Sequence, residues 1–182
     1  MRKLLGAAIV AVRLFNMSGL PESDVREAMK VAAGLFEVAG LQLIVTNCPS
    51  EGPSDAACAS DLAPDERVVR VIRSSTAWQT NNVRLGDAVV DRETRSGVLA
   101  TVYADRVAWM AADVGIDRPL LMGRAIAHEV GHLLIGSSSH SPLGLMRARW
   151  TSDEMRRDRP SDWFFSTRDA SRLRTAAVTQ PR

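Results

Sequence analysis

All three histidines of this 182-residue chain lie in one short segment, HEVGHLLIGSSSH, which begins at His128. His128 and His132 are four residues apart, so on a helix their imidazoles lie on one face, one turn apart. Nitrogens at this spacing can bind one zinc ion, and Glu129 is placed to take a proton from a water molecule. His140 offers a third nitrogen beyond Gly136, a residue suited to ending a helix. Three imidazoles leave a position open on zinc, as catalytic zinc sites do.

The alternative is a helix that carries two histidines and binds no metal, because the bare H-E-x-x-H pattern also arises by chance. The context argues against it. Residues 120–135 are apolar nearly all the way round, so this helix is expected to be buried. Buried polar side chains need partners, and a zinc ion would supply one for His128, Glu129 and His132.

The succession of HEVGH, Gly136, His140 and Met146 resembles the metzincin clan of zinc endopeptidases. Residues 140–146, HSPLGLM, look most like the His-Ser … Leu-Met passage of matrixin-type members. The resemblance implies that His128, His132 and His140 bind zinc and that Glu129 is the general base. It also implies that Met146 packs beneath the metal in a methionine turn.

The spacing departs from the usual metzincin pattern at the third ligand. Gly136 follows His132 by four residues and His140 follows Gly136 by four, where three is usual in each case. We therefore expect a helix one residue longer and a wider turn. An acid of the following helix, Asp153 or Glu154, is the alternative third ligand.

The predicted function is zinc-dependent endopeptidase activity, with Glu129 as the base. The alternative is a non-catalytic zinc-binding protein that keeps the fold and uses the cleft for binding. Glu129 argues against this alternative, since a structural zinc site needs no base and usually closes with four ligands. The single tyrosine, Tyr103, lies upstream, and the sequence does not show what stabilises an oxyanion.

Length and composition predict one domain spanning residues 1–182, since 46% hydrophobic and 24% charged residues are typical of a globular protein. A net charge of +2 is too small to indicate a nucleic-acid partner. No stretch approaches the roughly 20 apolar residues of a membrane span. The oligomeric state is left open.

The N-terminus and the two cysteines bear on the compartment. Residues 1–12 resemble the charged and apolar parts of a signal peptide, but residues 9–15 also suit a strand, which we favour. Cys48 and Cys58 flank a loop rich in Pro, Ser and Gly, and we expect a disulfide rather than two free thiols. A secreted or periplasmic location is therefore favoured over a cytoplasmic one. Cys48 as an inhibitory zinc-capping thiol has little support from its flanking residues.

The expected fold is α/β (α+β): a mixed, mostly parallel twisted sheet with backing helices, the zinc helix under a cleft, and a helical C-terminal end. Strands are predicted near 8–15, 41–46, 67–73, 85–90 and 98–103, and helices near 20–39, 105–114, 117–135, 151–154 and 166–177. By the resemblance, residues 85–90 form an antiparallel edge strand that binds an extended peptide or protein substrate. The alternative is an ordinary protected edge strand. Arg147 and Arg149 are candidates to bind a substrate carboxylate.

Overall fold

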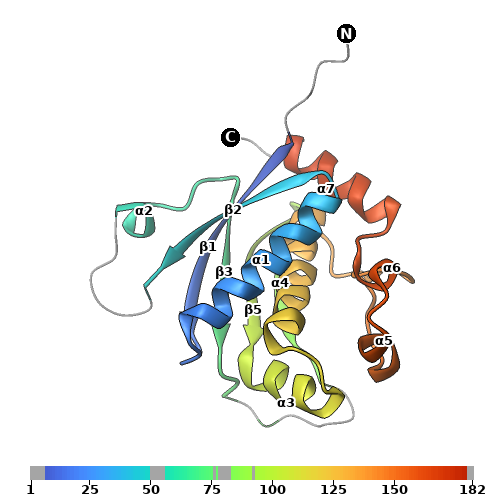
Figure 1. Cartoon of the computed structure of the whole chain (residues 1–182). Coiled ribbons are helices and arrows are strands. Elements are labelled where there is room, and N and C mark those ends of the chain that lie inside the picture. The colour runs from blue at the N-terminus through green and yellow to red at the C-terminus, as the bar shows by residue number, and fades with distance from the viewer. Residues whose placement is uncertain (1–6, 50–55, 76, 78–82, 92, 180–182) are drawn as a thin grey trace.

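The computed structural model describes residues 7–49, 56–75, 77, 83–91 and 93–179 (Figure 1). The charged start of the signal-like segment, residues 1–6, lies outside this range. The apolar residues that follow form strand β1, Ala8–Met17. Within the described part of the chain, no helix is both long enough and apolar enough to cross a membrane.

Five strands form one sheet in the order β2-β1-β3-β5-β4. Beside β1 these are β2 (Leu41–Cys48), β3 (Glu66–Ile72), β5 (Ser96–Tyr103) and β4 (Gly86–Asp91). The pairs β1–β2, β1–β3 and β3–β5 are parallel, whereas β4 is antiparallel to β5 and forms one edge. The predicted mostly parallel sheet with an antiparallel edge strand is confirmed.

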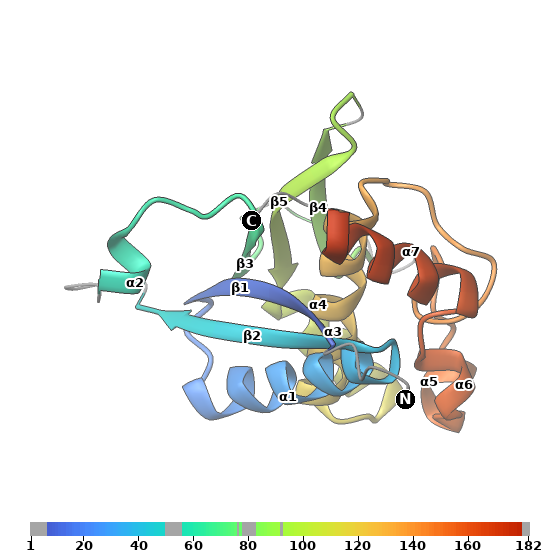
Figure 2. The same cartoon turned by 90° about the horizontal axis from the view of Figure 1, so that it is seen from above.

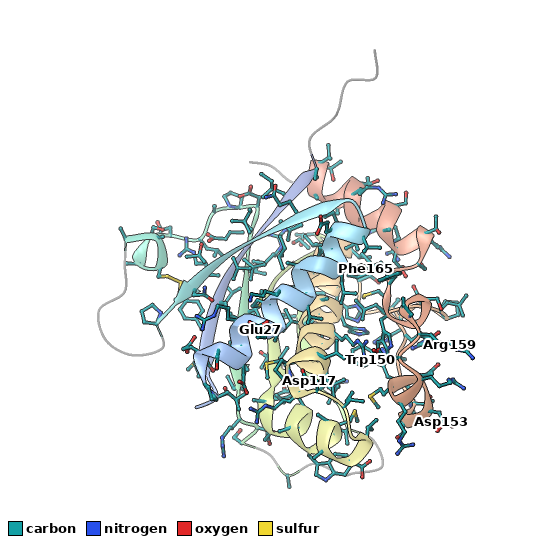
Figure 3. The ribbon with its side chains drawn as sticks, in the orientation of Figure 1. Glu27, Asp117, Trp150, Asp153, Arg159 and Phe165 are labelled. Atoms are coloured by element: carbon teal, nitrogen blue, oxygen red, sulfur yellow. A yellow bond between two sulfur atoms is a disulfide. The ribbon has the colours of Figure 1, made fainter. Side chains whose placement is uncertain are left out.

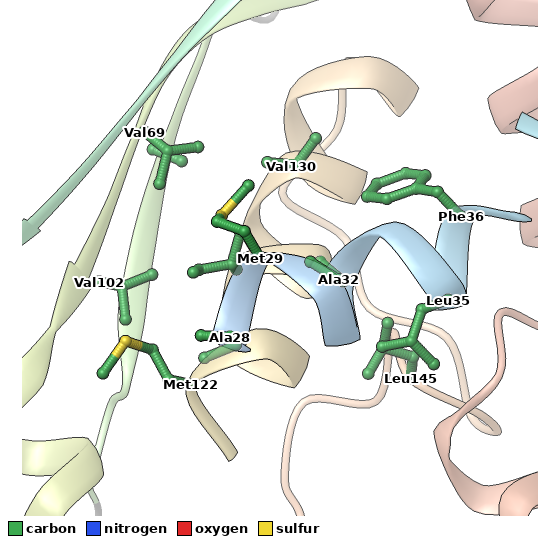
Figure 4. Close-up of a cluster of buried hydrophobic side chains, with 14 of the residues drawn as sticks. Ala28, Met29, Ala32, Leu35, Phe36, Val69, Val102, Met122, Val130 and Leu145 are labelled. Atoms are coloured by element: carbon green, nitrogen blue, oxygen red, sulfur yellow. The ribbon is translucent and has the colours of Figure 1, made fainter. Parts of the chain in front are cut away.

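Two long helices, α1 (Glu22–Val38) and α4 (Arg118–Ile135), cover one face of the sheet (Figures 1 and 2). Helix α4 begins as predicted, because the Asp117 side chain accepts a hydrogen bond from the backbone N–H of Leu120. Figure 4 shows the core that these helices share with the strands: Ala28, Met29, Ala32, Leu35, Phe36, Val69, Val102, Met122, Val130 and Leu145.

Helices α1 and α4 approach each other closely at Gly123. A Cβ atom at this position would lie 2.4 Å from the backbone oxygen of Ala28 and 2.6 Å from Val31 Cβ. Only a glycine leaves room for this contact, and the contact fixes the height of α4 against α1.

The remaining helices include α3 (Ala104–Val114), directly before α4, and three C-terminal helices beyond it (Figure 2). The latter are α5 (Ser152–Arg157), α6 (Pro160–Trp163) and α7 (Thr167–Thr179). The sequence indicated α5 and α7 but not α6, nor the one-turn α2 (Ala56–Ala59) in the cysteine loop. Four-residue helices are too short to show a periodic pattern.

A disulfide joins Cys48, at the end of β2, to Cys58 in α2 (Figure 3). The loop after α2 is also attached to β1, since the Arg13 guanidinium donates to the backbone oxygens of Ser60 and Asp61 at 2.6 and 2.9 Å. Arg13 Nε donates to Glu66 Oε1 at 2.7 Å. This bond and the Arg13 charge lower the pKa of Glu66, although partial burial opposes them.

Candidate metal centre

Helix α4 carries the first two histidines and the glutamate into the interior. His128, Glu129 and His132 are 7%, 8% and 4% exposed, and the apolar side chains around them explain why this helix lacks a solvent face. The four-residue spacing places both imidazoles on one side, with ring centroids 4.7 Å apart. The expectation of a buried helix that carries these three polar residues is confirmed, and Arg124 is a fourth buried polar side chain on it.

Backbone carbonyls fix the tautomers of these two rings. His128 Nδ1 lies 2.8 Å from the oxygen of Leu145, and His132 Nδ1 lies 2.7 Å from that of Ser137. A carbonyl oxygen only accepts, so each Nδ1 must carry the proton and donate. The two Nε2 atoms are therefore unprotonated in the neutral rings and face each other at 3.0 Å. Two lone pairs at that separation repel, and a bound cation removes the repulsion.

Burial keeps the imidazoles neutral. It lowers the pKa of His128 to about 3, with the nearby His132 as the second cause. Burial also lowers the pKa values of His132 and of His140. All three rings are thus neutral at pH 7, which is the form that binds metal ions.

The turn at the end of α4 brings His140 to the pair. Gly136 ends the helix in the left-handed conformation, with φ 63°, and its N–H donates to the backbone oxygen of His132. The His140 ring centroid lies 5.3 Å from that of His128 and 4.8 Å from that of His132. One nitrogen from each ring lies within 4.8 Å of the other two.

The two alternative acids lie elsewhere. Glu154 caps its own helix, accepting from the backbone N–H of Thr151 at 2.8 Å, and it pairs with Arg147 at 3.0 Å. Asp153 is exposed and pairs with Arg156 on the same helix at 3.6 Å. The structure therefore places His140 beside the other two histidines, with neither acid there.

A close contact explains why the residue at position 136 must be a glycine. A Cβ atom there would lie 1.8 Å from the backbone oxygen of Arg95, in the turn between β4 and β5. Arg95 itself has a positive φ of 52°. The hairpin turn and the end of α4 thus meet backbone to backbone, a contact that the sequence does not reveal.

Met146 lies on a turn that packs under α4. Gly144 has φ 73°, and the backbone N–H of Leu145 donates to Phe164 O at 2.9 Å. Met146 is 1% exposed, and a Cβ on Gly131 would lie 2.7 Å from its sulfur. Gly131, between the two helical histidines, is thus the residue that lets methionine approach the site. Sequence reasoning did not single it out.

Asp169 of α7 also supports the turn that carries His140. It is 1% exposed and accepts from the hydroxyls of Ser141 at 2.8 Å and Ser166 at 2.6 Å. Ser141 directly follows His140. The sequence marked Ser166 and Asp169 as a helix start, and only the tertiary structure shows that Asp169 reaches Ser141.

A cleft of about 470 Å³ opens over these residues. Its walls are the β4 side (Val83, Arg84, Leu85, Gly86, Asp87, Ala88), the site residues, and the segment Arg147, Ala148, Arg149, Trp150. Gly86 lies against the glutamate, because a Cβ there would be 2.7 Å from Glu129 Cγ. Burial, and next the charge of Asp87, raise the pKa of Glu129 to about 8, although Arg84 opposes the shift.

The donor set fits zinc. Three imidazole nitrogens converge. Carbonyls hold the Nδ1 protons of His128 and His132, so the Nε2 lone pairs of these two rings are free to bind. Carbonyl acceptors behind metal-binding histidines are the usual support of such sites. Tyr103 is not among the residues that line the cleft. Its hydroxyl donates to Asp87, which does line it, at 2.6 Å.

Two solved structures share this architecture. One is a zinc-dependent peptidase from Methanocorpusculum labreanum, with TM-score 0.58, 16% identity, and coverage of 90% of this chain and 100% of that chain. The other is archaemetzincin from Methanopyrus kandleri, with TM-score 0.56, 16% identity, and coverage of 94% and 97%. The chain shares its fold with these two proteins. No protein-family model and no curated protein sequence matches the chain.

Proposed function

We propose that this protein is a zinc-dependent endopeptidase of metzincin type, with His128, His132 and His140 as the metal ligands. The observation that carries the proposal is the convergence of three imidazole nitrogens beside Glu129 in an open cleft. The similarity to two zinc peptidases supports the same assignment at the level of the fold.

Zinc, when bound, supplies a Lewis acid that polarises a carbonyl and lowers the pKa of a water molecule beside it. The protein's own contribution is the placement of Glu129. Its carboxylate accepts the proton of the attacking water and then gives it to the leaving amine. A cation at the histidines favours the carboxylate form of Glu129, in opposition to the burial that raises its pKa.

The substrate binds along β4, whose edge is free of a neighbouring strand in the described sheet. Residues 83–88 line the cleft, so an extended peptide paired with this edge runs past Glu129. Backbone pairing demands little of the substrate sequence. Met146 packs beneath the histidines and shapes the site from below.

Replacement of the base tests the proposal. Glu129→Gln keeps all three nitrogens, so it should retain zinc while kcat/KM on a mixed peptide library falls about 10²–10⁴-fold. Zinc is measured by elemental analysis, and parent activity should vanish with a chelator and return with zinc. The matched control is Glu27→Gln, an exposed carboxylate of α1.

Each other outcome has a clear meaning. Parent-level activity in Glu129→Gln removes this residue from the base role. Zinc-loaded parent protein that cleaves nothing supports a non-catalytic zinc-binding protein instead.

A further inference from the structure

Three arginines line the cleft, and they differ in what surrounds them. Arg84 pairs with Asp87. Arg147, with 12% of its side chain exposed, pairs with Glu154 and donates to the backbone oxygen of Asp162. Arg149 is exposed and has no hydrogen bond or ion pair with any residue that the structure describes.

The position of Arg149 is fixed by its neighbours on both sides. The turn that holds Met146 precedes it, and Trp150 follows it. The Trp150 indole donates to Leu145 O at 3.2 Å and packs edge-on against His128, with ring centroids 5.6 Å apart. Figure 3 shows Trp150 beside α4, toward the C-terminal helices. Arg149 is therefore carried on an anchored segment, next to a residue that touches the metal site.

The charges of the cleft leave this guanidinium without an anion. Two acidic residues line the cleft, Asp87 and Glu129. Asp87 already accepts from Tyr103 and pairs with Arg84, and Glu129 is buried against Gly86. A guanidinium binds a carboxylate through two parallel hydrogen bonds, which a ligand entering the cleft can supply.

We propose that Arg149 determines specificity by binding a carboxylate of the peptide substrate. The proposal rests on the peptidase function proposed above. The carboxylate has two possible sources: an aspartate or glutamate side chain within the peptide, or the free C-terminus of a short peptide that is cleaved at an internal bond. Arg147, which the sequence offered equally, is already paired within the protein.

Matched peptide pairs test the proposal with the zinc-loaded full chain. One set has both ends blocked and places Glu or Gln at each position around the scissile bond; the other carries a free or an amidated C-terminus. The parent should favour the carboxylate member of one set by about tenfold in kcat/KM, and Arg149→Gln should abolish that preference. The peptide set that shows the preference identifies whether the carboxylate comes from a side chain or from the C-terminus.

Arg26→Gln is the control, since it removes an equal charge from the exposed face of α1, outside the cleft. It should keep the parent preference. Zinc content and unfolding temperature show that Arg149→Gln remains folded. If the parent hydrolyses the peptides, the proposal is overturned when the parent shows no preference in either set, or when Arg149→Gln retains the preference.

A binding measurement separates this proposal from the peptidase assignment. Fluorescence anisotropy of the same peptides on zinc-loaded Glu129→Gln, with and without Arg149→Gln, requires no turnover. Tighter binding of carboxylate peptides that depends on Arg149 supports the carboxylate site even if the parent hydrolyses nothing. If the parent hydrolyses nothing, equal binding of both members of each pair contradicts the site.

Discussion

Two backbone carbonyls determine what the histidines can do. Leu145 O and Ser137 O accept hydrogen bonds from the Nδ1 atoms of His128 and His132. Both Nε2 atoms therefore keep a lone pair that can bind a metal. His140 has no such carbonyl partner among the described contacts and is the more exposed ring. It depends on the turn after Gly136 for its position, which makes it the most informative of the three proposed ligands to remove.

His140→Ala should weaken zinc binding about 100-fold or more, because only two of the three protein nitrogens remain to bind the metal. Zinc affinity is measured by competition with a chromophoric chelator. Asp153→Ala is the matched control, since that acid pairs on the surface with Arg156, and its zinc affinity should equal that of the parent. Zinc retained in His140→Ala but lost in Asp153→Ala or Glu154→Ala would show that an acid is the third ligand.

Helix α4 is held by glycines that meet different parts of the molecule. Gly123 meets α1, Gly131 meets the Met146 side chain, and Gly136 meets the hairpin turn. Strand β5 contributes a similar contact: a Cβ atom on Gly97 would lie 2.7 Å from a methyl carbon of Leu133 in α4. The helix that carries His128 and His132 is therefore positioned by close approach at these glycines as well as by its large buried side chains.

Gly123→Ala should lower the free energy of unfolding by about 1–3 kcal/mol, because the new methyl group collides with the backbone of α1. Chemical denaturation measures the change, and zinc affinity should fall as α4 shifts. Gly34→Ala is the control: a Cβ there meets nothing within 4 Å, so it should stabilise α1 by up to about 1 kcal/mol. Equal effects of the two substitutions would contradict the close-packing argument.

Across the whole molecule, the long helices and the cysteine loop are attached to the sheet in different ways. Helices α1 and α4 bury one face with apolar side chains. The cysteine loop is attached to β2 by the disulfide and to β1 by Arg13, which also forms an ion pair with Glu66 of β3. Both partners of that pair are largely buried, with 8% and 13% of their side chains exposed. Removal of the Glu66 charge takes away the carboxylate that lies closest to the buried Arg13 guanidinium.

This pair predicts a pH dependence of stability. The pKa of Glu66 is lowered in the folded protein, so its stabilisation is fully present above its ordinary value and is lost as pH falls through the folded value. Glu66→Gln should therefore lower the free energy of unfolding by about 1–3 kcal/mol at pH 7. The difference between variant and parent should shrink below about pH 4. Urea denaturation across this range measures it.

Glu27→Gln serves as the control, because the Glu27–Lys30 pair is exposed and should contribute less than about 0.5 kcal/mol. A gap between Glu66→Gln and the parent that stays constant from pH 7 to pH 3 would show that charge is not the cause.

Local patterns in the sequence were sufficient for the elements and for half of the site. The four-residue spacing of His128 and His132 follows from the helical repeat, and Asp117, Pro119 and Gly136 mark where α4 begins and ends. The alternation of apolar residues predicted the strands, and their order with the helices predicted the mostly parallel sheet. These features depend only on neighbours within a few residues.

Contacts between distant segments could come only from the tertiary structure. The sequence left His140, Asp153 and Glu154 as alternatives, and their positions depend on how the turn meets Arg95 and Asp169. It offered Arg147 and Arg149 equally, and the difference between them is an ion pair with Glu154. The physical reason is that a local pattern fixes which way a side chain points on its own element. What that side chain meets is set by the packing of elements far apart in the chain.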